Sequence, residues 1–445
     1  MPRKPDSDGD AARRAARTRH RRRRDSTPPG PDGPGSSTPW ASNLRGPAGQ
    51  LFGDPAPSPD ETSFQVDNTS EEYYDSPYYT QHENDIEAVP MGAPAAPLDL
   101  QDVVGEEFLA PIVMGKKIAF HAVGDTGASS SANITSEASV ADAMVADLQG
   151  PTADAPAFFF NLGDVIYNFG EAEYYYDQFY EPFREYDRPI FAIPGNHDGA
   201  VTYTRGGSDP DAPSLQAFIA NFCSATPSKP QDVGGLARTT MTQPGVYFTL
   251  DAPFVSIVGL YTNVLEGPGV ITDEGGAYPA LAGDGQYGWL VSELQRLAPQ
   301  RARLERAVIL ACHHPPVSAD LVHGGTTGLA NDLDRAFNAA GLWPDAVVSG
   351  HAHVYQRFSR SVNGREIPYV VAGSGGHEAR VPSGEQAGEA PRRWNDYTLL
   401  VGPLASYGYL TVTVDMRAST TRTLTISFTA PPSSVAVDQV TVSLT

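Results

Sequence analysis

Five short polar blocks in this sequence carry the residue types that could do chemistry. Carboxylates, one amide, several imidazoles and a phenol occur in them, and each block follows an apolar run. Carboxylate and amide oxygens combined with imidazole nitrogens suit iron, manganese or zinc. The pattern therefore predicts a two-metal hydrolytic site assembled from distant parts of the chain. The blocks are GDTG at 124–127, GDVIY at 163–167, GNHD at 195–198, CHHPP at 312–316 and GHAHVY at 350–355.

The position of each block after an apolar run explains how such distant residues could meet. Side chains just past the carboxyl ends of strands converge in the crevice where open α/β sheets bind ligands. Asp125 and Asp164 each follow a glycine, which lets the backbone turn sharply and approach a ligand closely. His351 and His353 are two residues apart, so on an extended segment both point the same way.

The elements that must position these blocks alternate along the chain. Apolar strand-like runs and helical patterns follow one another, which predicts a layered α/β fold. Near the C-terminus, residues 409–414 and 423–428 alternate apolar and polar residues, as half-exposed strands do. The other predicted strands are 117–123, 157–162, 189–194, 245–250, 254–261, 308–311, 346–348 and 369–371, and the predicted helices are 135–149, 171–185, 214–222 and 287–297.

Composition narrows the class of protein. The chain has 445 residues, 40% of them hydrophobic, and a formal net charge of -22, which argues against nucleic acid as partner of the folded part. With two cysteines, the fold needs no disulfide framework. No apolar run is long enough to span a membrane, and the basic N-terminus lacks the apolar core of a secretion signal. A cytoplasmic location is therefore the expectation.

The first 100 residues differ from the rest. They are rich in Pro, Gly, Ser, Asp and Arg, basic at first and then acidic, and lack apolar periodicity. Such a segment cannot bury enough apolar surface to fold. We expect a disordered tail over residues 1–100 and one folded domain over residues 101–445.

The order of the five blocks resembles that of the calcineurin-like metallophosphoesterases. Most of that superfamily has a histidine two residues after the first aspartate, where this chain has Gly127, and Tyr167 follows three residues after Asp164. This combination looks like the purple acid phosphatases. The resemblance implies a sandwich of two mixed β-sheets flanked by helices, and residues 101–445 would form the metallophosphoesterase catalytic domain with C-terminal β-strands.

The resemblance also implies a ligand set for two metal ions. A ferric ion would be held by Asp125, Asp164, Tyr167 and His353. A divalent iron, zinc or manganese ion would be held by Asp164, Asn196, His313 and His351, with Asp164 bridging the two metals. His313 is preferred over His314 because the ligand in the resembling family precedes x-Pro.

The implied activity is hydrolysis of small-molecule phosphate monoesters, by attack of a metal-bound hydroxide on phosphorus, as in acid phosphatases. His197 would protonate the leaving group, with Asp198 orienting its ring. His323, in a glycine-rich loop ten residues after His313, would contact the phosphate, and His377 would line the rim of the site. The oligomeric state is not indicated.

Two other functions remain open. The same two-metal core could serve a phosphodiesterase that acts on cyclic nucleotides or phospholipid head groups. A chain of this kind could also bind metal without turnover and act as an interaction protein. Tyr167 favours the monoesterase, and His197 argues against a protein without turnover.

Overall fold

The structure of this chain is a computed structural model in which the fold is described from residue 88 onward. Of the tail expected over residues 1–100, residues 1–87 lie outside the described part, whereas residues 98–99 form a short strand of a sheet. Within residues 88–445 the structure does not describe 129–130, 151–153, 168–169, 171, 200–213, 239–241, 265–268, 273–284, 321–322, 380–389 and 419–420.

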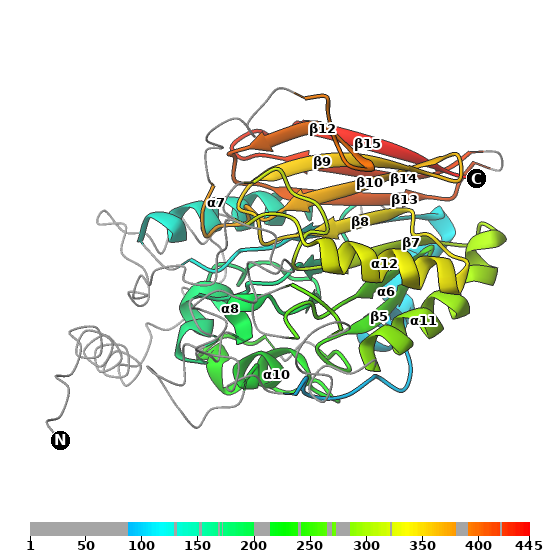
Figure 1. The fold of residues 1–445 in the computed structure, drawn as a ribbon. Helices are drawn as coiled ribbons and strands as arrows, with labels where there is room; N and C mark the ends of the chain where they lie inside the picture. Colours follow the sequence, from blue (N-terminus) through cyan, green and yellow to red (C-terminus); the bar gives the residue numbers. More distant parts are fainter. Residues whose placement is uncertain are drawn as a thin grey trace, which may run out of the picture.

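The described strands form two mixed β-sheets (Figure 1). The first has nine strands in the order β1 (Leu98–Asp99), β5 (Phe248–Ala252), β6 (Val255–Gly259), β7 (Ala307–Cys312), β8 (Ala346–Ser349), β10 (Arg365–Ala372), β9 (Tyr355–Val362), β12 (Tyr397–Leu404) and β11 (Arg392–Trp394). The second has six in the order β15 (Ala436–Leu444), β14 (Arg422–Thr429), β13 (Tyr409–Asp415), β2 (Lys117–Val123), β3 (Phe159–Asn161) and β4 (Ile190–Ala192).

The two sheets share one apolar core. Phe120 on β2 stacks on Phe158 with ring centroids 4.7 Å apart, and this cluster continues into Ile257 on β6 and Ile309 on β7. Burial of such side chains is the main favourable term in folding. Tyr355 on β9 stacks on Phe428 of β14 at 4.0 Å, so an aromatic pair also joins the sheets.

Helices cover the outer faces of both sheets. The helices α11 (Gly285–Ala302) and α12 (Thr327–Ala340) lie beside the first sheet (Figure 1). Their leucines pack on residues of β6, β7 and β8. The helix α7 (Ser131–Asp147) packs on β2 and β3 of the second sheet. The expected sandwich of two mixed sheets flanked by helices is therefore confirmed. The shorter helices are α5 (Leu100–Val104), α6 (Glu106–Gly115), α8 (Asn196–Gly199) and α10 (Gln216–Phe222), with a 3-10 turn at Gln231–Val233.

The helix expected over residues 171–185 is wrong as a single element. The described residues there form a 3-10 turn at Ala172–Tyr174 and a π-helical turn at Tyr176–Tyr180. The reason is tertiary, because the buried Gln178 side chain is held by the backbone of Tyr167. It accepts from the Tyr167 N–H at 2.7 Å and donates to the Tyr167 carbonyl at 2.6 Å. These bonds hold the π turn and the tyrosine together.

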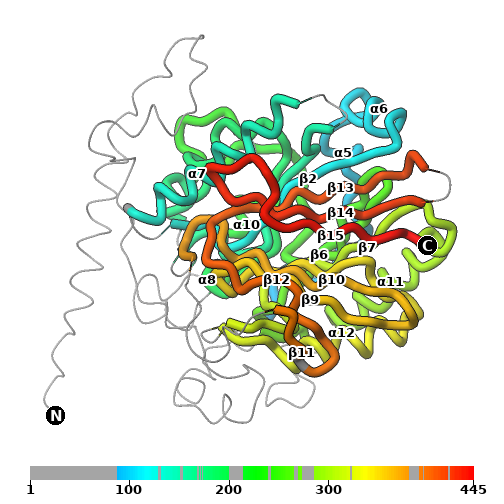
Figure 2. Tube along the Cα trace, turned by 90° about the horizontal axis from the view of Figure 1, so that it is seen from above, coloured from blue at the N-terminus to red at the C-terminus, as the bar shows by residue number. Residues whose placement is uncertain are grey.

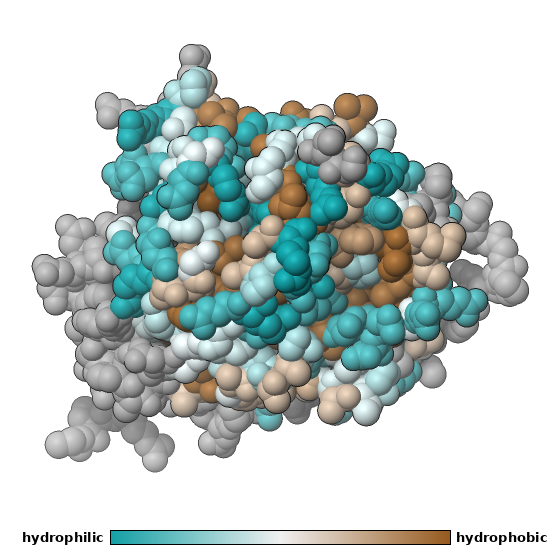
Figure 3. Space-filling model, turned by 90° about the vertical axis from the view of Figure 1, so that its right-hand side faces the viewer, coloured by the Kyte–Doolittle hydropathy of each residue, from teal (hydrophilic) through white to brown (hydrophobic). Residues whose placement is uncertain are grey.

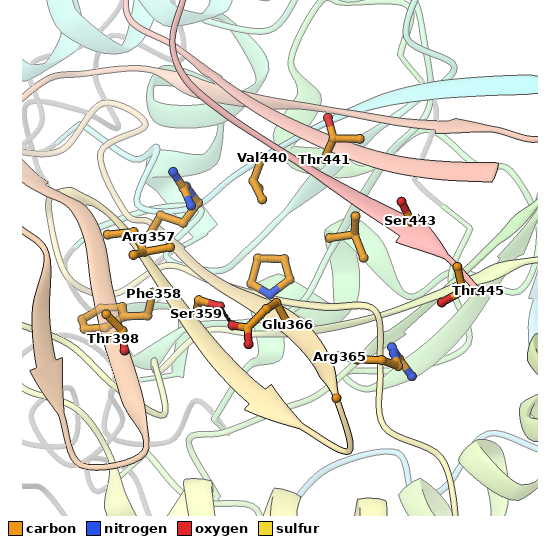
Figure 4. Close-up of a pocket in the computed structure, with 14 residues that line it drawn as sticks. Arg357, Phe358, Ser359, Arg365, Glu366, Thr398, Val440, Thr441, Ser443 and Thr445 are labelled. Atoms are coloured by element: carbon orange, nitrogen blue, oxygen red, sulfur yellow. Dashed lines mark hydrogen bonds between the residues drawn. The ribbon is translucent and has the colours of Figure 1, made fainter. Parts of the chain in front are cut away.

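Strand β15, at the edge of the second sheet, contacts strand β9 of the first sheet. Seen from above, it lies beside the β9–β10 hairpin (Figure 2). Asp438 on β15 accepts from the Tyr355 hydroxyl at 2.6 Å and from Arg357 at 2.6 and 3.0 Å. A groove of about 540 Å³ opens along this junction (Figure 4), lined by residues of β9, β10, β12 and β15. None of the residues of the five polar blocks lines it.

The face on the right-hand side of Figure 1 carries both polar and apolar side chains (Figure 3). Figure 3 shows hydrophilic side chains across this face, with hydrophobic ones in separate small areas. In the part of the chain that the structure describes, no helix is long and apolar enough to cross a membrane.

We expect Asp345→Ala to destabilise the fold by about 3–5 kcal/mol, because it leaves Arg301 buried without its counter-charge. Asp345 is fully buried, and Arg301 donates to it through Nε and Nη2 at 2.8 to 3.0 Å. Urea unfolding measures the effect. Glu305→Ala is the control, since Glu305 pairs with Arg303 on the surface and should leave stability unchanged. Equal stability of the two variants would contradict the prediction.

Candidate metal centre

The five polar blocks meet at the carboxyl ends of strands from both sheets. The blocks with Asp125, Asp164 and Asn196 follow β2, β3 and β4, and the histidine blocks follow β7 and β8. Parallel pairing of β2 with β3, of β3 with β4 and of β7 with β8 brings these ends together within each sheet. The contact of Asp164 with His313 joins the two sets of ends. All seven expected ligand side chains are buried there: Asp125, Asp164, Tyr167, Asn196, His313, His351 and His353.

One group of donor atoms gathers around the phenol of Tyr167. Its hydroxyl lies 3.2 Å from Asp125 Oδ1, 2.9 Å from Asp164 Oδ2 and 3.2 Å from His353 Nε2. His353 Nε2 lies 3.3 Å from Asp125 Oδ1. The expected ferric set of four residues is thus within contact distance of one point.

A second group gathers around the amide of Asn196. Its Oδ1 lies 3.0 Å from His313 Nε2 and 2.9 Å from His351 Nδ1. His313 Nε2 lies 3.4 Å from Asp164 Oδ2, the same oxygen that faces Tyr167. Asp164 therefore lies between the two groups, as a bridging carboxylate would.

The backbone at these positions is strained. Asp125, Asp164 and His351 have φ of 57°, 52° and 66°, in the left-handed region that residues other than glycine rarely adopt. Non-glycine residues in this region each cost free energy and cluster at functional sites. A Cβ at Gly195 would stand 2.1 Å from Asp164 Oδ1, so only glycine allows this approach.

The space around Gly127 explains why no histidine stands two residues after Asp125. A Cβ at Gly127 would stand 2.6 Å from the Cα of Ile166 and 2.8 Å from the carbonyl oxygen of Val165. The backbone of the second polar block fills the space that a side chain would need. The same block continues to Tyr167, whose hydroxyl reaches the centre.

The charges of the centre depend on one another. Burial alone would raise the pKa of Asp164, but the nearby His313 and His197 outweigh it and hold that pKa well below its usual range. Burial likewise opposes charge on His313, yet Asp164 raises the pKa of His313 to about 9. Buried charges in proteins are paired or coordinate metal ions. Two adjoining sets of oxygen and nitrogen donors around buried carboxylates fit two metal ions.

His197 lies against the Tyr167 ring, and Asp198 makes contacts other than the expected one. The His197 ring lies 4.3 Å from the Tyr167 ring, and its backbone N–H donates to Asp164 Oδ1 at 2.9 Å. Asp198 was expected to orient the His197 ring, but its carboxylate accepts from the backbone N–H groups of Gly195, Val165 and Ile166. The carboxylate therefore fixes the two loops that carry the ligands.

His323 and His377 both border the centre. The His323 ring lies 4.8 Å from His351 and 4.7 Å from His353, and its Nδ1 is 3.0 Å from Asp320. His377, expected at the rim, stacks on Tyr167 at 3.5 Å with 9° between the rings.

Three contacts of the centre escaped the sequence analysis, those of Asp320, Gln178 and Glu378. Glu378 lies 3.5 Å from His353 Nδ1. Spacing offered a signal only for Asp320, three residues before His323.

Comparison with solved structures finds proteins of low sequence identity. A dimetal phosphatase from Danio rerio has 11% identity and a TM-score of 0.38, covering 74% of this chain and 99% of that one. PhoD has 12% identity and a TM-score of 0.41, covering 80% and 70%. A protein described as a putative 5'-nucleotidase from Staphylococcus aureus has 14% identity and a TM-score of 0.34, covering 72% and 56%. None of the curated proteins matches the sequence.

The family described as calcineurin-like phosphoesterase matches residues 119–355, just over half of the chain. The matched range begins in β2 and ends at Tyr355, so it contains all five polar blocks. Metal-dependent hydrolysis of phosphoesters at a two-metal centre is the chemistry of this family. This chain belongs to the calcineurin-like phosphoesterase family.

Proposed function

We propose that this protein is a phosphomonoesterase of the purple acid phosphatase type, with a ferric ion beside a divalent ion. The observation that carries the proposal is the place of the Tyr167 hydroxyl, within 3.2 Å of both Asp125 and His353 and 2.9 Å from Asp164. Phenolate is a hard, anionic donor that suits a trivalent ion. The ferric ion would be held by these four residues.

The divalent ion, iron, zinc or manganese, would be held by the group around Asn196. Asn196, His313 and His351 supply one amide oxygen and two imidazole nitrogens, and Asp164 is shared. Two metal ions side by side supply a nucleophile by lowering the pKa of bound water, and they hold the phosphate oxygens. Within this arrangement the chain's own residues position the substrate and move its protons.

His197 is the group we assign to proton transfer. It follows the ligand Asn196 directly, and its backbone N–H is anchored on Asp164. An imidazole nitrogen of His197 would give its proton to the leaving-group oxygen as the phosphorus–oxygen bond breaks. His323 would bind a phosphate oxygen, because its ring borders His351 and His353 while Asp320 fixes its Nδ1.

The alternative function is phosphodiester hydrolysis on cyclic nucleotides or phospholipid head groups, which the same centre could support. The third is metal binding without turnover, as an interaction protein. Tyr167 favours the monoesterase over the first alternative, because related diesterases keep a histidine where this chain has Gly127. The full donor set next to His197 favours an enzyme over a metal-binding protein without turnover.

We expect the purified full-length protein, loaded with iron and zinc, to hydrolyse p-nitrophenyl phosphate with a higher kcat/KM than bis-p-nitrophenyl phosphate. His197→Gln should lower kcat on the monoester about 10²–10⁴-fold, the contribution typical of general acid catalysis, with metal content unchanged. Faster hydrolysis of the diester would overturn the monoesterase assignment. Turnover of neither ester at full metal occupancy would leave a metal-binding protein.

A further inference from the structure

His314 stands beside the centre, and the proposed ligand set leaves it without a role. Its ring is fully buried, 4.3 Å from the His351 ring and 5.1 Å from the His313 ring. Gly269 also packs against this ring, since a Cβ added at Gly269 would stand 2.7 Å from Cγ and Cδ2 of His314. The ring is therefore packed closely, and its orientation is fixed by its surroundings.

The hydrogen bonds of Thr262 determine which nitrogen of this ring carries the proton. The Thr262 hydroxyl is buried, and among the described residues His314 is its one hydrogen-bond partner. The hydroxyl oxygen accepts from the His314 backbone N–H at 3.2 Å and lies 2.8 Å from His314 Nδ1. Since a buried hydroxyl must also donate, its proton goes to Nδ1, which is then an acceptor. In the neutral ring the proton is on Nε2, and a protonated ring would also have one there.

This accounting leaves His314 Nε2 as a buried donor, and it has no hydrogen-bond partner within the described part of the protein. A buried donor without an acceptor costs free energy comparable to a lost hydrogen bond, so such groups are rare in native structures. The same loop has a second case: Asn263 is 1% exposed, and neither of its amide atoms has a partner among the described residues. The unpartnered N–H of His314 points to a ligand with an acceptor oxygen on this side of the centre.

We propose that His314 binds a phosphoryl oxygen of the substrate and of the phosphate product, through the N–H of Nε2. The inference rests on the proposed function and extends it, because it adds a binding residue on the side of the divalent ion. The His314 and His323 rings both lie near His351, the latter at 4.8 Å. Together they would supply two donors to one tetrahedral oxyanion.

The test measures the affinity of the metal-loaded, full-length protein for inorganic phosphate by calorimetry. The matched variants are His314→Asn and His314→Gln, two amides that differ by one methylene. The amide of glutamine reaches the place of Nε2, whereas that of asparagine reaches the place of Nδ1. We expect Kd to rise at least about tenfold in His314→Asn and to stay within about threefold in His314→Gln.

His314→Leu is a second variant without a donor, and it should match His314→Asn. Metal content and melting temperature should be unchanged in all three. The proposal is overturned if His314→Asn and His314→Leu bind phosphate as the wild type does, if they lose metal, if His314→Gln is as weak as they are, or if the wild type does not bind phosphate. Phosphate binding without turnover of any monoester would instead overturn the proposed function alone.

Discussion

We expect the iron-loaded wild type to be purple to pink and its Tyr167→Phe variant to be colourless. Tyrosinate bound to ferric iron absorbs visible light by charge transfer from the phenolate to the metal. The Tyr167 hydroxyl lies among Asp125, Asp164 and His353, and phenylalanine keeps the ring but removes the donor atom. A visible spectrum, recorded together with iron analysis of protein purified without chelator, measures the effect.

The control for this variant is Tyr175→Phe. Tyr175 is also fully buried, and its hydroxyl has no hydrogen-bond partner among the described residues. The same chemical change there should leave the colour and the iron content as in the wild type. A wild type that is colourless at full iron occupancy would contradict the ferric assignment. Zinc or manganese would then be the candidates for the metal ion at Tyr167. Colour that survives in Tyr167→Phe would show that another residue supplies the phenolate.

The sequence predicted the place of this centre because the rule behind it is local. Each polar block follows an apolar run, and the strand over residues 117–123 is confirmed with the same bounds as β2. Carboxyl ends of parallel strands meet at one edge, so residues as far apart as Asp125 and His353, 228 positions, could be expected together. Because the strand ends of the two sheets lie close together, the five blocks form the two groups of donor atoms around Tyr167 and Asn196.

Backbone strain at the centre could not be predicted. Asp125, Asp164 and His351 adopt positive φ, and the modest enrichment of aspartate and histidine in this region does not single out these three positions. The contacts that impose this conformation come from distant residues, such as the His351 N–H that donates to Asp125 Oδ2 at 2.7 Å. The role of Asp198 was missed for the same reason, since its three partners lie on two loops.

Some elements were missed although the sequence held a signal. Leu329, Leu333 and Phe337 recur at spacing of four, and they form the buried face of α12 over Thr327–Ala340. The preceding Gly-rich segment hid this helix. Strand β9 was missed because its residues pair at the register set by the hairpin to β10, with Tyr369 opposite Phe358. Only Tyr355, Gln356 and Phe358 of this strand are buried, too few for a clear apolar pattern in the sequence.

Asn196→Ala should remove the divalent metal and lower kcat/KM at least about a hundredfold, yet leave the colour. Loss of outer contacts to a ligand already costs 10 to 100-fold in metal affinity or activity, so loss of a ligand should cost more. Asn196 Oδ1 contacts His313 and His351, whereas the Tyr167 hydroxyl contacts Asp125, Asp164 and His353. Metal analysis, the visible spectrum and monoester turnover on the same sample give the three readouts.

The effect of His351→Ala should match that of Asn196→Ala, because His351 belongs to the same group of donors. His121→Ala is the control, since His121 is a buried histidine that contacts Tyr186 and Asp147 instead of the centre. That variant should lose stability but keep both metals and the colour. If Asn196→Ala or His351→Ala turns over substrate at the wild-type rate, the two groups do not form one catalytic centre. If either loses its colour together with the divalent metal, the two sites are filled as one unit, with Asp164 as the bridge between them.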